Sequence, residues 1–198
     1  MTFERKGWIH LAVLVVTASS ILTAGCLDEG EGESVGVSAF SLFVTADTEK
    51  NDHGGNLELV VVTAMEPTSK GNSLSWKFAY NEAASGTTTG SFLITIDHGG
   101  EVTRAEGDPL QKSPIRNWSL DSTSAYTKAR DRLIEDGVIS ETTKVSVQFL
   151  YLLGDDENNN GCEWTVGMVL GSDQPLEVTV NVDGNSGQIL ELISSKGQ

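Results

Sequence analysis

Apolar and polar residues alternate along several short segments of the chain. In residues 176–183, for example, Leu176, Val178, Val180 and Val182 are separated by polar side chains. Successive side chains of a β-strand point to opposite faces of a sheet, so a period of two predicts antiparallel strands with one buried face. Six segments are expected to be strands, and they span residues 57–65, 73–81, 91–97, 144–153, 163–170 and 176–183.

The alternation also predicts which strand residues face the core. In 144–153 it places Val145, Val147, Phe149 and Tyr151 together on one face. Three tryptophans raise a separate question, because aromatic side chains can form either a ligand platform or a core. Strand tryptophans in a small sheet are more often core, and this is the prediction for Trp76, Trp118 and Trp164.

Two segments carry the helical period. In residues 121–137, Asp121 is expected to cap a helix whose buried face includes Tyr126 and Leu133, and Gly137 is expected to end it. The other residues expected on that face are Ala125 and Ala129. A second, weaker helix is expected from about residue 37 to 49.

The apolar set of the weaker helix is expected to include Val37, Phe40 and Val44 with the neighbours Leu42, Phe43 and Ala46. Its β-branched residues lower the helix propensity. Helices combined with antiparallel strands predict an α+β fold.

The N-terminal segment has the pattern of an export signal. Arg5 and Lys6 precede an apolar run from Trp8 to Leu22, which is followed by small residues. A positive head, a short apolar body and small residues before a cleavage site are typical of a secretory signal. The alternative is a permanent membrane helix, but a comfortable span needs about 20 apolar residues. Residues 1–25 are therefore predicted to be a signal peptide.

The residues before Cys26 read Thr23-Ala24-Gly25. This segment resembles the lipobox of prokaryotic lipoproteins, in which the cysteine receives a lipid and becomes the mature N-terminus. Leucine is usual three places before that cysteine; here Thr23 occupies the place, a residue compatible with archaeal lipoproteins. The resemblance implies lipidation of Cys26, with residues 26–35 forming an acidic, glycine-rich tether.

Charge and cysteine content narrow the function. The chain of 198 residues has a formal net charge of −15 and only two cysteines, Cys26 and Cys162. A nucleic-acid binder needs lysine and arginine to neutralise phosphates, so the composition argues against that class. Two cysteines cannot build the disulfide framework of a small secreted domain. Cys162 is expected to be a buried structural thiol.

Two halves of the chain share one order of features. Each reads as a helix, a strand, a tryptophan-bearing strand, and a strand that ends in aspartate before a glycine turn. Trp76 corresponds to Trp164, and Asp97 corresponds to Asp183; both aspartates are expected to open turns. This correspondence indicates an internal duplication.

The tryptophan strand followed by the aspartate turn, together with the helix entry from Asn117 to Ala129, resembles a PepSY-like domain. The resemblance covers residues 117–195 best and 36–110 more weakly, because His98-Gly99-Gly100 replaces the longer turn. It implies two helix-plus-antiparallel-sheet halves, each with a last strand after the glycine turn. Such modules occur in peptidase propeptides and envelope proteins, where they bind or restrain peptidases without catalysis.

The acidic loop at residues 154–161 is the main candidate for a metal site. Asp156, Asn158, Asn160 and the following glycine match the first half of a calcium-binding loop. The glutamate that should close such a loop is absent, because Gly167 stands at its place. An EF-hand is therefore excluded. A looser calcium site through the same three side chains stays open beside the simpler interpretation, a solvated hairpin loop.

No catalytic motif is recognisable in the sequence. No nucleophile elbow and no phosphate-binding glycine loop occur. After signal removal the histidines are His53 and His98, both beside glycines, whereas a zinc enzyme needs three protein ligands and an open site. Asn117 begins an Asn-Trp-Ser sequon and is a candidate for glycosylation.

These observations predict an exported protein anchored to the extracytoplasmic face of the cell membrane by lipid on Cys26. We expect a non-catalytic binding or accessory protein without a cofactor, acting on a peptidase or another envelope protein, by binding an extended peptide at a sheet edge or face. Two alternatives stay open: a calcium- or metal-assisted surface hydrolase, and a solute-binding lipoprotein.

Overall fold

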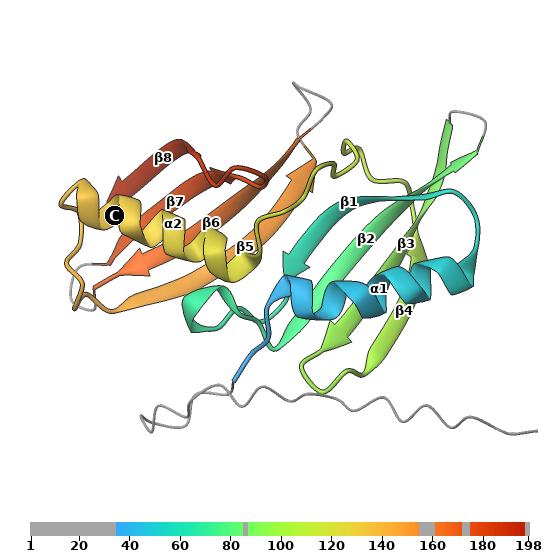
Figure 1. Ribbon diagram of the computed structural model, residues 1–198, viewed down its shortest axis with the longest axis horizontal. Helices are drawn as coiled ribbons and strands as arrows, with labels where there is room; N and C mark the ends of the chain where they lie inside the picture. The colour runs from blue at the N-terminus through green and yellow to red at the C-terminus, as the bar shows by residue number, and fades with distance from the viewer. Residues whose placement is uncertain (1–34, 85–86, 155–160, 172–174, 197–198) are drawn as a thin grey trace, which may run out of the picture. The chain divides into compact units, whose positions relative to one another are not determined.

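The computed structural model describes residues 35–84, 87–154, 161–171 and 175–196, and within them it contains two α-helices and one antiparallel sheet (Figure 1). The helices are α1 (Ala39–His53) and α2 (Ser122–Glu135), and a short 3₁₀ turn, η1, spans Ser69–Gly71. The predicted α+β fold is confirmed at this level. No helix among the described residues is both long and apolar enough to cross a bilayer.

The described chain forms eight strands in one sheet. Four follow α1 and four follow α2 along the sequence. In spatial order the sheet is β4-β3-β2-β1-β5-β6-β7-β8, and every neighbouring pair is antiparallel. The strand bounds are β1 (Leu57–Ala64), β2 (Ser75–Ala84), β3 (Thr87–Asp97), β4 (Val102–Gly107), β5 (Val145–Gly154), β6 (Cys162–Leu170), β7 (Leu176–Asp183) and β8 (Ile189–Lys196).

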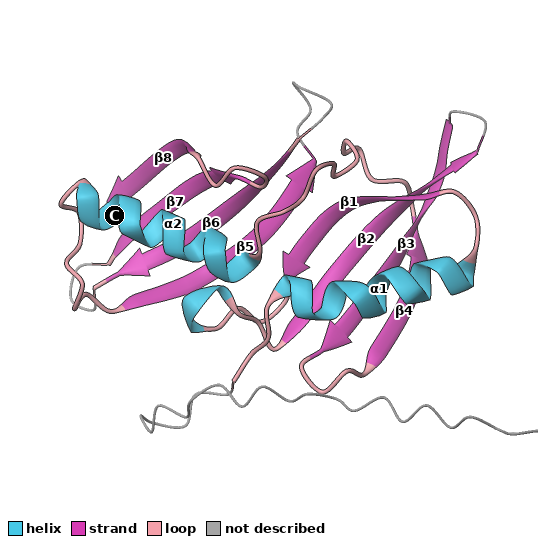
Figure 2. Ribbon diagram, viewed as in Figure 1, coloured by secondary structure: helices cyan, strands magenta, loops and turns pink. Residues whose placement is uncertain are grey.

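Both helices cover the same face of the sheet (Figure 2). Helix α1 packs on β1, β2 and β3, whereas α2 packs on β6, β7 and β8. The sheet joins in the middle through a short pairing of β1 with β5, in which Val62 lies opposite Leu152. Each helix therefore buries apolar strand residues that would otherwise face water, and one hydrophobic cluster runs beneath both.

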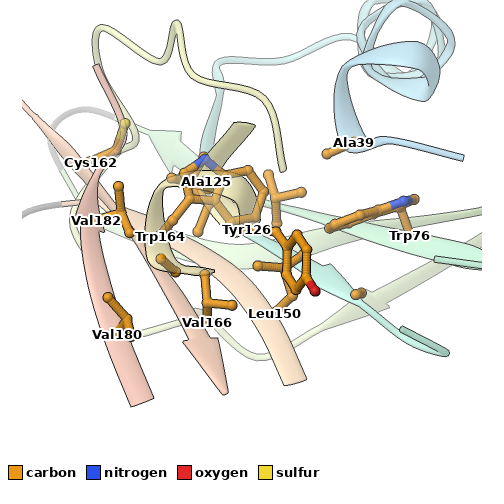
Figure 3. Packing of buried hydrophobic residues seen from close by; sticks show 14 of the residues in the cluster. Ala39, Trp76, Ala125, Tyr126, Leu150, Cys162, Trp164, Val166, Val180 and Val182 are labelled. Carbon is orange, nitrogen blue, oxygen red and sulfur yellow. The ribbon is translucent and has the colours of Figure 1, made fainter. Parts of the chain in front are cut away.

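Trp76 and Trp164 lie at the centre of this cluster, and both side chains are fully buried (Figure 3). Their rings meet edge to face with centroids 6.1 Å apart. Each indole N–H donates to a main-chain carbonyl two residues before a helix: Trp76 to Val37, 2.8 Å, and Trp164 to Leu120, 2.7 Å. A buried indole thus keeps a hydrogen-bond partner, and the predicted core role of these two tryptophans is confirmed.

Trp118 differs from the other two because it is only half-buried. Its ring packs against Trp164 at 6.1 Å and against Phe40 and Phe43 of α1, at 4.5 and 5.0 Å. It joins the edge of the core and contributes apolar contact to the start of α1. The three rings do not form an exposed stack, because Trp76 and Trp164 are fully buried. They therefore do not form the platform for a ligand that was the alternative.

Helix α2 follows its prediction closely. Asp121 is the N-cap and accepts the Ser122 N–H at 2.7 Å, and Gly137 follows the helix with φ of 69°. The predicted buried face is also confirmed, since Tyr126 and Leu133 are buried together with Ala125 and Ala129.

Helix α1 exists, but it extends four residues beyond the predicted end, and one residue of its predicted apolar set is exposed. Val44, predicted to face the core, is 73% exposed, while Ala39 and Ala46 are buried. The predicted neighbours Leu42, Phe43 and Ala46 do pack in or against the core, so the prediction was wrong for Val44.

Strand β5 shows a second difference from the predicted pattern. A bulge between Val147 and Phe149 adds one residue to the strand, and an extra residue moves all later side chains to the opposite face. Leu150 and Leu152 are consequently buried, whereas Phe149 is 38% exposed. The prediction that Phe149 and Tyr151 share the buried face with Val145 was wrong for this reason.

The two edge strands, β4 and β8, were not among the six strands predicted by alternation. Strand β4 is exposed along nearly its whole length, so its side chains need no apolar face to mark it. The PepSY resemblance did imply a last strand after each glycine turn, and strands are present at both of those places.

Candidate functional site

Several of the predicted site residues lie outside the described residues. These are the signal peptide, Cys26 and the tether within residues 1–34, and the loop residues Asp156, Asn158 and Asn160. The lipid anchor and the calcium site therefore stay predictions that rest on the sequence.

Asn117 lies in the connection between β4 and α2 and is exposed. Its φ of 56° puts the backbone in the left-handed region, which asparagine adopts more readily than most residues. The predicted surface-loop position of the sequon is confirmed, and its glycosylation stays a prediction.

The two histidines occupy different places along β3. The His53 ring stacks on Phe92 with centroids 4.0 Å apart, whereas His98 follows the far end of the strand and donates its main-chain N–H to Leu74. The five residue steps from Phe92 to Asp97 span roughly 16 Å of strand. Among the described residues, no group of three or more His, Cys, Asp or Glu side chains could hold a metal ion.

Cys162 starts β6 and is only 2% exposed. Its sulfur packs so closely on Gly184 that a Cβ at that glycine would lie 2.5 Å away. This position in the core agrees with the predicted structural role.

Strand β4 forms one end of the sheet and pairs only with β3, as β8 at the other end pairs only with β7. Residues 103–107 are all exposed. The outer side of such a strand presents main-chain N–H and C=O groups that no neighbouring strand satisfies.

A hollow of about 540 Å³ lies beside this edge, between the C-terminal part of α1 and strands β3 and β4. It is the candidate functional site. Its lining residues are Glu49, Asp52, His53, Phe92, Arg104, Ala105 and Glu106.

Strand register explains why the charged residues of β4 face this hollow. Arg104 lies opposite Ile94, and Glu106 lies opposite Phe92. Ile94 and Phe92 belong to the buried cluster beneath the helices, so paired residues project toward the same helix-covered side. The side chains of β4 that alternate with them point to the other face.

One ion pair and one ring stack organise the walls. The Arg104 guanidinium pairs with the Glu49 carboxylate on α1, which fixes the helix to the edge strand. His53 covers Phe92, of which only 5% is exposed. Three carboxylates, Glu49, Asp52 and Glu106, face one arginine around the hollow, so its formal charge is −2 when His53 is neutral.

Sequence reasoning missed this site because its residues come from three separate segments: residues 49–53, residue 92 and residues 104–106. The only local sign is the polar alternation in Val102–Gly107, where Arg104 and Glu106 are separated by Ala105. Without the pairing of β4 with β3, nothing in the sequence connects those residues to Asp52 and His53.

Comparison with known proteins gives little further guidance. No protein-family model matches the chain, and no curated protein matches it in sequence. One solved structure that matches is described as a putative lipoprotein from Clostridium difficile 630; it shares 11% identity, with a TM-score of 0.49, and the match covers 82% of this chain and 96% of that one. The lipid-anchor prediction continues to rest on residues 22–26.

Proposed function

We propose that this protein is a lipid-anchored, extracytoplasmic binding protein that captures an extended, basic segment of an envelope partner along β4. The observation that carries the proposal is the exposed β4 edge beside the acidic hollow lined by Asp52, His53 and Glu106. The function is non-catalytic, and a peptidase is one partner that the PepSY resemblance suggests.

Matching hydrogen bonds support an internal duplication behind this architecture. The N–H that follows each turn-opening aspartate donates to a carbonyl two residues before a core tryptophan: His98 to Leu74, and Gly184 to Cys162. Each helix is followed by four strands. We infer two related halves, residues 36–110 and 117–195, joined through β1 and β5.

The turns themselves also correspond. The Asp97 carboxylate accepts the Glu101 N–H at 2.8 Å, and the Asp183 carboxylate accepts the Asn185 N–H at 3.1 Å. Gly100 and Gly187 both have left-handed backbones, with φ of 87° and 75°. Glycine adopts this conformation at the lowest cost, so each turn uses the same pair of residue types for the same reasons.

Strand addition is the binding mode that fits β4. An extended peptide that pairs with an edge gains main-chain hydrogen bonds, each worth about 0.5 to 1.5 kcal/mol net. Every second side chain of the added strand would then point to the helix-covered side, next to Arg104 and Glu106. The hollow lies on that side.

The negative charge of the hollow beside β4 favours a basic partner. A lysine or arginine side chain in the hollow would approach Asp52 and Glu106, while an acidic one would meet repulsion. The net charge of −15 adds a long-range attraction for basic segments. Conversely, two copies of this chain repel one another, and charged edges of this kind disfavour edge-to-edge aggregation.

The test is binding of synthetic peptides to the full chain in mild detergent. An extended peptide with alternating lysine and threonine should bind, and its counterpart with glutamine for lysine should bind more weakly. Replacing Asp52→Asn together with Glu106→Gln should weaken the lysine peptide by roughly threefold to tenfold, because exposed ion pairs contribute up to about 1 kcal/mol each.

Two controls separate strand addition from simple charge attraction. N-methylation of alternate peptide amides removes donors without changing charge, so it should abolish binding if the peptide pairs with β4. Glu141→Gln, an exposed acid in the loop after α2, should leave the affinity unchanged. Equal binding of the methylated and unmethylated peptides would contradict the proposal.

A further inference from the structure

A second hollow lies between η1 and α2, on elements that take no part in the β4 edge. Its volume is about 620 Å³. Its lining residues are Lys70, Asn72, Thr123, Tyr126, Thr127, Arg130 and Asp131. In a chain with net charge −15, two of these seven residues are cations and only one is an acid.

The η1 wall is held rigidly against α2. Gly71 lies so close to the helix that a Cβ on it would be 2.5 Å from the Ser122 carbonyl oxygen and 2.8 Å from the Tyr126 Cβ. Next to it, Lys70 has φ of 61°, a conformation that a residue with a side chain rarely adopts. Strain of this kind persists where surrounding packing enforces it, and it recurs at ligand-binding sites. Lys70 is one of the residues that line the hollow.

Tyr126 contributes an aromatic ring with a hydroxyl to this hollow. The residue is only 7% exposed and lines the hollow. A phenolic hydroxyl can donate and accept a hydrogen bond, so a ligand in the hollow that Tyr126 lines can use it. Burial raises the pKa of Tyr126, and the hydroxyl is therefore a donor at neutral pH.

The other donors converge on the same space. The hydroxyls of Thr123 and Thr127 are already used, since they donate to Asp121 and to the Thr123 carbonyl. Arg130 uses one guanidinium nitrogen on the Glu141 carbonyl, and its remaining N–H groups are available. The donors left for a ligand belong to Lys70, Asn72, Tyr126 and Arg130.

We propose that this hollow binds a carboxylate group, held by Lys70 and Arg130 and accepting a hydrogen bond from Tyr126. The two cations Lys70 and Arg130, with further N–H and O–H donors beside them, fit an anion. Asp131 reduces the local charge to +1, which a singly charged carboxylate neutralises, whereas a doubly charged phosphate would leave one negative charge uncompensated beside Asp131. The carboxylate comes either from an acidic side chain or from the C-terminus of a peptide.

The first experiment titrates the full chain, in mild detergent, with sodium acetate against sodium chloride at equal ionic strength. Amide resonances of Asn72 and Thr127 should shift and saturate with acetate and not with chloride. Phosphate should bind more weakly than acetate. The absence of a saturable acetate shift, or tighter binding of phosphate, would overturn the proposal.

Variants then assign the groups. Tyr126→Phe removes one oxygen and should weaken acetate by about fivefold, and Arg130→Gln should weaken it by about tenfold or more. Asp131→Asn should tighten binding by removing the opposing charge. Lys128→Gln makes the same charge change on an exposed residue of the same helix and should have no effect. If Lys128→Gln weakens acetate binding as much as Arg130→Gln does, non-specific charge attraction explains the data and the proposed site is rejected.

Two peptides distinguish the sources of the carboxylate. One carries glutamate within a blocked chain, and the other has a free C-terminus and neutral side chains. Binding of either, with loss in Arg130→Gln, supports the proposal and names the source; binding of neither overturns it. A melting temperature for each variant shows that the fold is intact, and these outcomes do not depend on whether peptides pair with β4.

Discussion

The Asp121 side chain accepts main-chain N–H groups at the start of both helices. Its carboxylate accepts the Ser122 N–H at the start of α2 and, at 3.0 Å, the Phe40 N–H near the start of α1. Loss of an N-cap costs about 1 kcal/mol, and a second acceptor adds a similar amount. We expect Asp121→Ala to lower the free energy of unfolding by about 2 kcal/mol in urea denaturation.

Asp121→Asn serves as the matched control, because it keeps a side-chain oxygen acceptor and should retain most of the stability. An equal loss in both variants would show that the negative charge, and not the accepted hydrogen bonds, holds the two helix ends.

Tyr80 carries a buried hydroxyl that lacks a hydrogen-bond partner among the described residues. Its side chain is 1% exposed, and burial, aided by the charge of Asp47, holds its pKa well above the usual 10. Removing an unsatisfied hydroxyl while keeping the ring should stabilise the fold. We expect Tyr80→Phe to raise the free energy of unfolding by about 1 kcal/mol at neutral pH.

The same residue predicts a pH dependence. Because the folded-state pKa of Tyr80 lies above the unfolded value, the unfolded chain loses this proton first as pH rises. The stabilising contribution of proton binding is complete below pH 10 and declines above it. Between pH 10 and 11.5 the wild-type chain should therefore lose stability faster than Tyr80→Phe, as thermal melts would show; parallel curves would contradict this.

At the scale of elements, apolar patterns predicted six of the eight strands because those six place apolar side chains in the core. They failed where burial does not follow a period of two. The bulge after Val147 is a backbone irregularity, and no residue type at that place predicts it. Strand β4 has no buried face to give a signal. Val44 was misplaced because α1 contacts the core through Leu42, Phe43 and Ala46.

The bulge in β5 brings Phe149 across Gly167 on the neighbouring strand. A Cβ on Gly167 would lie 2.3 Å from the Phe149 ring. We expect Gly167→Ala to destabilise the fold by about 1 to 3 kcal/mol through this clash. In the background Phe149→Ala the same substitution should cost much less, and a double-mutant cycle measured by urea denaturation gives the difference. Additive effects would show that the ring does not constrain the glycine.

At the scale of the whole molecule, the candidate site depends on pairing between distant segments. The sequence shows Asp52 and His53 near the end of a weak helix and Arg104 in a polar stretch, and neither pattern indicates chemistry. Only the register of β4 on β3, with α1 packed above, brings these residues to one hollow. Sequence reasoning therefore identified the core, the caps and the turns, while the site emerged from the fold.

The anchor is also a property of the whole chain, and it can be tested directly. If lipid on Cys26 holds the protein, Cys26→Ser should move it from the membrane pellet to the soluble fraction of expressing cells, because two lipid chains anchor stably whereas a net charge of −15 is repelled by anionic lipid. Cys162→Ser is the control, since that thiol is buried in the core, and it should remain in the pellet. If Cys26→Ser stays in the membrane, lipid on Cys26 is not required to hold the protein there, and the apolar run from Trp8 to Leu22 is the remaining anchor.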